Sequence, residues 1–186
     1  MENRLIELPF GLPGRIYRSP LPFSPYFDPD WKRLDEFIAA GVDVVMMLTP
    51  WMESYELTGF DMRKLYREQG MQVIEVPVID FAIPEKDALQ TPISQVLAAA
   101  QNRENIVIHC HAGRGRTGMV LACLARVVFG FGGGDAIRWV RQFIPSAVES
   151  RQQEKFVEEF NFLWDKTSLL QISPCLCDDQ GTGGTH

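Results

Sequence analysis

Short apolar runs that alternate with helical stretches are the feature that most restricts the fold of this 186-residue chain. The runs Val42 to Leu48 and Ile106 to Ile108 are rich in β-branched and other apolar residues, and only Asp43 interrupts them. Continuous apolar strands of this kind are buried on both faces, as in parallel sheets that helices cover on either side. The pattern therefore predicts an α/β fold with a central, mainly parallel β-sheet flanked by helices.

Helices are expected between and after these strands, because apolar residues recur there at helical spacing. They are predicted from Asp30 to about Gly41 and over residues 57–69, 91–102, 116–129, 135–143 and 150–164. Further strands are expected around Arg15 to Tyr17 and over Val73 to Val76, and none is expected after Cys110. The helix at 116–129 is apolar nearly all round, so it should be the buried central helix.

One domain is expected over residues 1–170, because a chain of this size can bury a single core and contains no internal repeat. Beyond Ser173 the composition becomes polar and rich in glycine, so residues 171–186 are expected to form a flexible C-terminal tail. The first residues do not have the charged-then-apolar pattern of a signal segment, and no stretch approaches eighteen consecutive apolar residues. These features predict a cytoplasmic protein.

The cysteines are too few for a disulfide scaffold and do not have the paired spacing of a zinc site. They are Cys110, Cys123, Cys175 and Cys177. A reducing compartment is the simpler expectation, and no metal is predicted. Three adjacent residues such as His109, Cys110 and His111 cannot converge on one tetrahedral ion.

The charge distribution restricts the partners. Eighteen Lys and Arg against 24 Asp and Glu give a formal charge of 18 − 24 = −6, which disfavours nucleic acid and an anionic membrane surface as partners. The basic residues are nevertheless concentrated, because residues 103–141 contain six Arg against Glu104 and Asp135. Residues 109–118 contain no carboxylate. The distribution indicates one small positive site for an anionic group.

Residues 109–118, here called the phosphate loop, leave a predicted strand and open a predicted helix. Gly113, Gly115 and Gly118 match the G-x-G-x-x-G pattern of dinucleotide-binding folds. That fingerprint also requires a strand with an acidic end about twenty residues later, which this sequence lacks. A Walker loop is excluded as well, because the segment contains no Gly-Lys-Ser/Thr.

The spacing of Cys110 and Arg116, with five residues between them, predicts an oxyanion site. Backbone N–H groups of a tight glycine-containing loop and the positive end of the following helix stabilise anions, including a thiolate at Cys110. The planar guanidinium of Arg116 can bind two phosphate oxygens at once. These residues therefore predict a phosphate site with a nucleophilic sulfur.

The sequence His109-Cys110, five residues, then Arg116-Thr117 resembles the His-Cys-x5-Arg-Ser/Thr signature of cysteine-dependent protein phosphatases. The resemblance extends from about Gly14 to Trp164 and is strongest to the compact dual-specificity group. It implies the protein-tyrosine-phosphatase-like fold and hydrolysis of phosphomonoesters through a phosphocysteine intermediate. It implies no cofactor and no metal.

The same resemblance implies roles for the residues of the phosphate loop. Cys110 is the nucleophile, Arg116 binds phosphate, and Thr117 donates a hydrogen bond to the leaving thiolate. His109 is expected to brace the loop by hydrogen bonding to its backbone. The remaining phosphate-binding positions are His111, Ala112, Gly113, Arg114 and Gly115.

A general acid is also required, because the leaving oxygen must be protonated as its bond to phosphorus breaks. Asp80 lies just after the predicted strand at 73–76, whose end should share a sheet edge with Cys110. By resemblance, Asp80 serves as this acid and then activates the water that hydrolyses the phosphocysteine. Glu85 and Asp87 are alternative donors, and a simple turn Asp is the alternative interpretation of Asp80.

Glu149 and Gln153 occupy positions where tyrosine-specific relatives often carry glutamines that position water. Gln153 is predicted to support the site in this way, while the Glu at 149 leaves that role open. The alternative is that both are ordinary polar residues at the start of the last helix. Cys123 is expected to pack in the core.

Three functions are compatible with these residues. The favoured one is a protein tyrosine or dual-specificity phosphatase acting on a phosphorylated protein or peptide. The second is a phosphoinositide or inositol polyphosphate phosphatase, because Arg114 and a partly protonated His111 could attract a further phosphate on a small polyphosphorylated molecule. The third is a catalytically silent phosphate-binding module. The sequence does not predict an oligomeric state.

Overall fold

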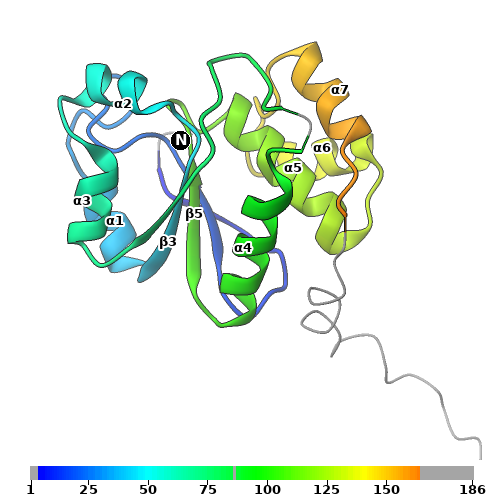
Figure 1. Cartoon of the computed structure of the whole chain (residues 1–186), viewed down its shortest axis with the longest axis horizontal. Helices are drawn as coiled ribbons and strands as arrows, with labels where there is room; N and C mark the ends of the chain where they lie inside the picture. Colours follow the sequence, from blue (N-terminus) through cyan, green and yellow to red (C-terminus); the bar gives the residue numbers. More distant parts are fainter. Residues whose placement is uncertain (1–3, 86, 164–186) are drawn as a thin grey trace, which may run out of the picture.

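The computed structural model describes residues 4–85 and 87–163. Within these residues, five strands form a sheet in the order β1-β2-β5-β3-β4 (Figure 1). The strands are β1 (Ile6–Leu8), β2 (Ile16–Ser19), β3 (Val42–Met47), β4 (Gln72–Glu75) and β5 (Asn105–His109). Strands β2, β5, β3 and β4 run parallel, and β1 pairs antiparallel with β2 at one edge. The predicted mainly parallel sheet is therefore confirmed.

Helices cover both faces of the sheet, with α1 and α3 on one side and α4 to α7 on the other (Figure 1). Their bounds are α1 (Arg33–Ala39), α2 (Trp51–Thr58), α3 (Met62–Glu68), α4 (Gln90–Gln101), α5 (Gly115–Phe129), α6 (Gly133–Arg141) and α7 (Arg151–Glu159). The predicted α/β fold class is confirmed.

Alternate residues of β3 point to opposite faces of the sheet and enter two separate cores. Val44 and Met46 pack in the larger core with α4 and α5, whereas Val45 and Met47 pack in the smaller core with α1 and α3. Because neither face of the strand meets water, both must be apolar, which explains the near-continuous apolar run in the sequence. Residues 115–125 of α5 are all buried, as its composition predicts.

The predicted helix at 57–69 is confirmed only as α3, because a separate helix, α2, precedes it and was not predicted. Helix α2 begins directly after Pro50 and ends at Gly59, whose φ of 76° lies in the left-handed region that terminates helices. Asp61 then caps α3 by accepting hydrogen bonds from the backbone N–H groups of Arg63 and Lys64. The correction matters because α2 lies at the sheet edge that carries the phosphate loop.

Two other boundaries differ from the sequence-based expectation. Strand β1 was not predicted, since three residues give too short a pattern to recognise. Helix α7 ends at Glu159, because Phe160 has extended backbone with ψ of 124°. The expected helix end at Trp164 and the expected tail at 171–186 lie outside the described residues, so the domain boundary at residue 170 stays a prediction.

The segments that follow the parallel strands converge at one edge of the sheet. Backbone hydrogen bonds of 3.0 Å from Leu21 to His111 and of 2.9 Å from Leu48 to His109 join the segments after β2 and β3 to the end of β5. Val78, after β4, donates to the Leu48 carbonyl at 2.9 Å. The carboxyl ends of parallel strands are the usual location of ligand sites in α/β folds.

Among the described residues, no single helix has the length and apolar character needed to cross a membrane. Helices α5 and α6 satisfy that test only when they are taken together, and the chain bends by 117° between them. The predicted cytoplasmic location stays a prediction.

Candidate active site

The phosphate loop turns tightly between β5 and α5. Gly113 has a φ of 70°, which favours glycine, and a Cβ there would overlap the carbonyl of Ser19. Both the backbone conformation and the lack of space therefore require glycine at this position. The Gly118 N–H donates to the Arg114 carbonyl at 2.7 Å and starts the helix. Cys110 is 3% exposed at the beginning of this turn. The loop and the N-terminus of α5 thus surround a buried sulfur.

The Arg116 side chain is 1% exposed and is held by a carboxylate from α2. Its Nη1 and Nη2 donate to the two carboxylate oxygens of Glu53 at 2.8 and 2.7 Å, and Nη1 also donates to the Val78 carbonyl at 2.9 Å. Burial alone would lower the pKa of the guanidinium, but the Glu53 hydrogen bonds and the negative charges of Cys110, Glu53 and Asp80 raise it. Arg116 therefore carries a fixed positive charge beside Cys110.

Asp80 reaches the same guanidinium, with its Oδ1 at 3.1 Å from Arg116 Nη2. The carboxylate of Asp80 is half exposed, so it borders both Arg116 and solvent. The Nε of Arg116 is buried and has no hydrogen-bond partner among the described residues. Arg116 thus has one donor without a partner among the described residues, and its Nη2 forms an ion pair with Asp80.

The loop at residues 79–84 is fastened to α7. The Ser150 hydroxyl donates to the Phe81 carbonyl at 3.2 Å, and Gln153 Nε2 donates to the Ala82 carbonyl at 3.3 Å. Phe81 has a φ of 59°, in a region that bulky residues rarely adopt. The backbone of Phe81 donates to Asp80 Oδ1 at 3.1 Å. These contacts hold Asp80 at the edge of the phosphate loop.

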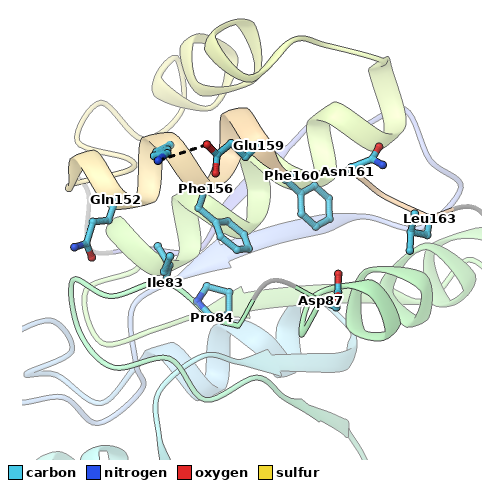
Figure 2. Close-up of a pocket in the computed structure, with 10 residues that line it drawn as sticks. Ile83, Pro84, Asp87, Gln152, Phe156, Glu159, Phe160, Asn161 and Leu163 are labelled. Atoms are coloured by element: carbon cyan, nitrogen blue, oxygen red, sulfur yellow. Dashed lines mark ion pairs between the residues drawn. The ribbon is translucent and has the colours of Figure 1, made fainter.

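The alternative donors lie apart from this cluster. Glu85 and Asp87 are exposed, and neither contacts Arg116 among the described residues. Asp87 instead lines a groove of about 750 Å³ between the 79–84 loop and α7, together with Ile83, Pro84, Phe156 and other residues (Figure 2). Of the three carboxylates weighed from the sequence, Asp80 is the one that the fold brings to Arg116.

Glu53 was missed by the sequence analysis. The residues before Leu57 were not assigned to a helix, so Glu53 had no predicted position relative to the phosphate loop. The available signal was its place soon after β3, since segments that follow parallel strands share one edge of the sheet. An acidic residue at that edge is a natural partner for a buried Arg.

Glu149 and Gln153 both lie against the phosphate loop, and their role in positioning water stays a prediction. Gln153 is fully buried, and its Oε1 accepts from the Glu149 N–H at 2.9 Å. A Cβ on Gly115 would overlap the Glu149 carboxylate, which accepts a hydrogen bond from the Gly115 N–H. Burial raises the pKa of Glu149, against the effect of that hydrogen bond. A second carboxylate thus lies at the phosphate loop.

The segment that carries Glu149 is held in a strained form. Val148 has a φ of 60°, which is a true outlier for a β-branched residue. Arg141 fixes it, because Nε and Nη2 donate to the carbonyls of Ala147 and Val148 at 3.0 and 3.1 Å. Arg141 Nη2 also donates to Glu154 at 2.9 Å. Strain of this kind persists only where surrounding contacts impose it.

His109 lies beneath the phosphate loop and is fully buried. Its Nδ1 is 3.4 Å from the Cys110 carbonyl and its Nε2 is 2.9 Å from the Tyr66 hydroxyl. Burial is the main reason that the pKa of His109 falls from 6.5 to about 4, so the ring is neutral at pH 7. Since a carbonyl only accepts, Nδ1 carries the proton and Tyr66 donates to Nε2.

This buried histidine should make the fold sensitive to acid. Between about pH 6.5 and 4 the unfolded chain binds a proton at His109 that the folded chain does not, so stability falls as the pH is lowered. The full loss is about 3 kcal/mol. Urea unfolding at several pH values should show a shallower decrease for His109→Gln than for the parent, since the two share every other titrating group. Equal slopes would rule out this contribution.

His111 and Arg114 contact the loop that follows β2. His111 Nε2 lies 3.2 Å from the Ser24 hydroxyl, and its ring meets the Phe27 ring edge-on at 4.8 Å. The guanidinium of Arg114 lies 5.8 Å from the centre of the Phe27 ring. Burial lowers the pKa of His111, which opposes the partial positive charge expected from the sequence.

Thr117 and Cys123 are both buried in helix α5. The Thr117 hydroxyl is buried in the first turn and makes no hydrogen bond within the described part of the chain. Cys123 is fully buried in the larger core, where burial raises the pKa of its thiol. The described residues contain no group of three His, Cys, Asp or Glu side chains that could hold a metal ion.

Comparison with known proteins gives consistent matches. The family model for the Swiss Army Knife protein DSP-PTPase phosphatase domain matches residues 29–157. The tyrosine-protein phosphatase cdc-14 of Caenorhabditis elegans is 25% identical over 140 residues, which cover 75% of this chain and 18% of that protein. The protein tyrosine phosphatase domain-containing protein 1 of Danio rerio is 30% identical over 104 residues, covering 55% and 14%. The chain thus spans less than a fifth of the length of these relatives.

Solved structures share the fold. Tk-PTP in its active form superimposes with a TM-score of 0.68 at 25% identity, covering 79% of this chain and 91% of that one. Kinase associated phosphatase gives a TM-score of 0.76 at 18% identity, covering 84% and 93%. PTPMT1 in complex with PI(5)P gives 0.65 at 18% identity, covering 78% and 88%.

Proposed function

The chain belongs to the DSP-PTPase phosphatase family, and on that premise we propose that it is a protein tyrosine or dual-specificity phosphatase. In this proposal it hydrolyses phosphomonoesters through a phosphocysteine at Cys110. The observation that carries the proposal is the buried Arg116, which lies beside Cys110 and is in contact with Asp80. Nucleophile, anion-binding group and acid then meet at one small site.

Substrate binding is proposed to use the two available donors of Arg116. The phosphate oxygens take the Nε–H, which has no partner among the described residues, and the side of Nη2 that now faces Asp80. Backbone N–H groups of the phosphate loop bind the remaining oxygens. Glu53 continues to accept hydrogen bonds from Nη1 and Nη2, so the orientation of the guanidinium plane of Arg116 does not change. Asp80 is released from Arg116, takes up a proton from solvent and can then protonate the leaving oxygen of the substrate.

The first chemical step transfers the phosphoryl group to sulfur. The Cys110 thiolate attacks phosphorus, an S–P bond forms, and the bond from phosphorus to the leaving oxygen breaks. Asp80 gives its proton to that oxygen, so the alcohol or phenol leaves neutral. Charge on the three equatorial oxygens is stabilised by Arg116 and the loop amides.

The second step hydrolyses the phosphocysteine and regenerates the Cys110 thiolate. Asp80, now a carboxylate, accepts a proton from water as the water oxygen attacks phosphorus. The S–P bond breaks, and inorganic phosphate and the thiolate are released. Thr117 is proposed to donate a hydrogen bond to that thiolate, which is supported by its buried and unpartnered hydroxyl. Gln153 and Glu149 flank the loop and are proposed to position the water.

A phosphoinositide or inositol polyphosphate phosphatase is the second candidate. Arg114 beside Phe27 supports it, as does the fold shared with PTPMT1 in complex with PI(5)P. The lowered pKa of His111 weakens it, because a neutral ring does not attract a second phosphate. A silent phosphate-binding module is the third candidate, and the presence of Cys110, Arg116 and Asp80 together argues against it.

The acid assignment can be tested with phenyl phosphate, whose leaving group needs protonation. The parent chain is expected to hydrolyse it with chelator present, and Asp80→Asn to lower kcat by about 10²- to 10³-fold with little change in KM. Asn preserves size and can still accept from Arg116. Glu85→Gln, on the same side of the domain, is the matched control and should retain kcat. A normal rate for Asp80→Asn together with a large loss for Glu85→Gln would show that Glu85, and not Asp80, is the general acid.

A further inference from the structure

Exposed apolar side chains are concentrated around the phosphate loop. Of the twelve large apolar side chains exposed in the described residues, nine follow β2, β3 or β4, within residues 26–31, 51–60 and 79–83. All three segments begin at the carboxyl edge of the sheet. Apolar surface gathered at one place on a small domain usually marks a binding surface.

Five aromatic residues in these segments are tied to the site, and we call them the aromatic rim: Tyr26, Phe27, Trp51, Tyr55 and Phe81. The rings of Tyr26 and Phe27 lie 6.2 and 4.8 Å from the His111 ring. Trp51 and Tyr55 stack at 5.7 Å on α2, the helix whose Glu53 holds Arg116. Phe81 directly follows Asp80. The rim residues therefore come from the three segments that follow β2, β3 and β4 at the carboxyl edge of the sheet.

The same segments are acidic. Residues 20–31, 50–61 and 79–89 contain two, three and three Asp or Glu, which is eight in all, against a single Lys. Five of the carboxylates are exposed, at Asp30, Glu56, Asp80, Glu85 and Asp87. Just beyond these segments, Lys32 pairs with Asp30 at 3.4 Å and Arg63 pairs with Asp61 at 3.2 Å. The site is thus a positive centre inside an acidic and aromatic border.

From this border we infer that the protein selects phosphorylated segments of other proteins whose flanking residues are apolar and basic. The inference rests on the proposed function and specifies its substrate. The dianionic phosphate meets Arg116 and the loop amides, apolar flanks pack on the aromatic rim, and basic flanks meet the exposed carboxylates. An anionic lipid surface or a ring with several phosphates carries negative charge, as the border does, so the acidic segments repel it.

The groove beside the 79–84 loop gives an apolar flank a place to bind. It begins two residues after Phe81, at Ile83 and Pro84, and continues along Phe156 and Phe160 of the α7 side (Figure 2). Lys155 and Glu159 pair with each other at 3.6 Å on its border, so the groove has no net charge from that pair. A side chain a few residues from the phosphorylated position can enter it.

The test compares two phosphopeptides of equal length and the same phosphorylated residue, prepared with phosphotyrosine and again with phosphothreonine. One has Leu, Phe and Arg as flanks and the other has Ser and Glu. The parent is expected to favour the apolar, basic peptide by about tenfold in kcat/KM. Tyr26→Ser, Tyr55→Ser and Glu56→Lys should each reduce that preference by about threefold. A ratio is used because changes in the chemical step cancel from it.

Matched control variants alter the same residue types away from the rim. Ile38→Ser on α1 and Glu68→Lys at the end of α3 should leave the preference of the parent unchanged. Dissociation constants of the same peptides for Cys110→Ser report flank selection without turnover. If the two peptides differ in dissociation constant but no phosphomonoester is hydrolysed, the proposed function is refuted and this inference is still supported. Equal values for the two peptides, or faster hydrolysis of phosphoinositide vesicles than of either peptide, would overturn the inference.

Discussion

Cys110→Ser is expected to reduce turnover of p-nitrophenyl phosphate to background, a loss of at least about 10⁴-fold. The serine hydroxyl is far less acidic than a thiol, so beside Arg116 it stays protonated and cannot attack phosphorus. The substitution removes no hydrogen bond of Arg116, whose donors are proposed to bind the phosphate. Binding of inorganic phosphate, measured by calorimetry, should therefore remain within about threefold of the parent.

Cys123→Ala is the matched control for this experiment. Cys123 is fully buried in the core of α5, away from the phosphate loop. Its substitution should cost some stability and leave the specific activity of the folded protein unchanged. Activity that survives Cys110→Ser, or that disappears with Cys123→Ala while the protein stays folded, would refute a phosphocysteine at position 110.

Arg116→Lys is expected to lower kcat/KM by about 10³-fold although the charge is kept. The guanidinium makes two contacts to Glu53, one to Val78 and one to Asp80, and still has Nε available. A single ammonium cannot hold Glu53 on one side and two phosphate oxygens on the other. The loss should be found in both phosphate affinity and kcat, because the lost donors serve the bound and the transition states.

Two further variants locate the origin of this effect. Glu53→Gln keeps the shape of the Arg116 partner and removes its charge, so a smaller loss of about tenfold is expected. Arg138→Lys changes an exposed arginine that pairs with Asp135 on the surface, and its rate should equal that of the parent. If Arg116→Lys retained full activity, phosphate binding would have to be assigned to another residue.

The sequence was sufficient to predict the parts of the site that are local in the chain. The phosphate loop, the strand before it and the buried helix after it are contiguous, so the spacing of Cys110, Gly113 and Arg116 already specified a turn of this kind. The sheet was predictable for a related reason. A strand that is buried on both faces has to be apolar throughout, and this pattern is visible in β3 and β5.

The parts that depend on long-range contacts were not predictable. Glu53 meets Arg116 across 63 positions, and only the parallel order of β3 and β5 brings them together. The short break between α2 and α3 depends on the backbone at Gly59 and on the Asp61 cap, which interrupt a stretch of otherwise helical spacing. The burial of Gln153 likewise depends on the packing of α7, and not on its own sequence.

The contact between Asp80 and Arg116 has a consequence for the end of the reaction cycle. Because a carboxylate of the protein pairs with the guanidinium, the proposed function requires inorganic phosphate to bind by exchanging one anion for another. The affinity for product then reflects only the difference between the two anions. In the proposed cycle Asp80 gives up to solvent the proton that it took from water and pairs with Arg116 again as a carboxylate, which helps to release the phosphate and limits product inhibition. A site that binds the phosphoryl group strongly in the transition state can in this way release inorganic phosphate rapidly after hydrolysis.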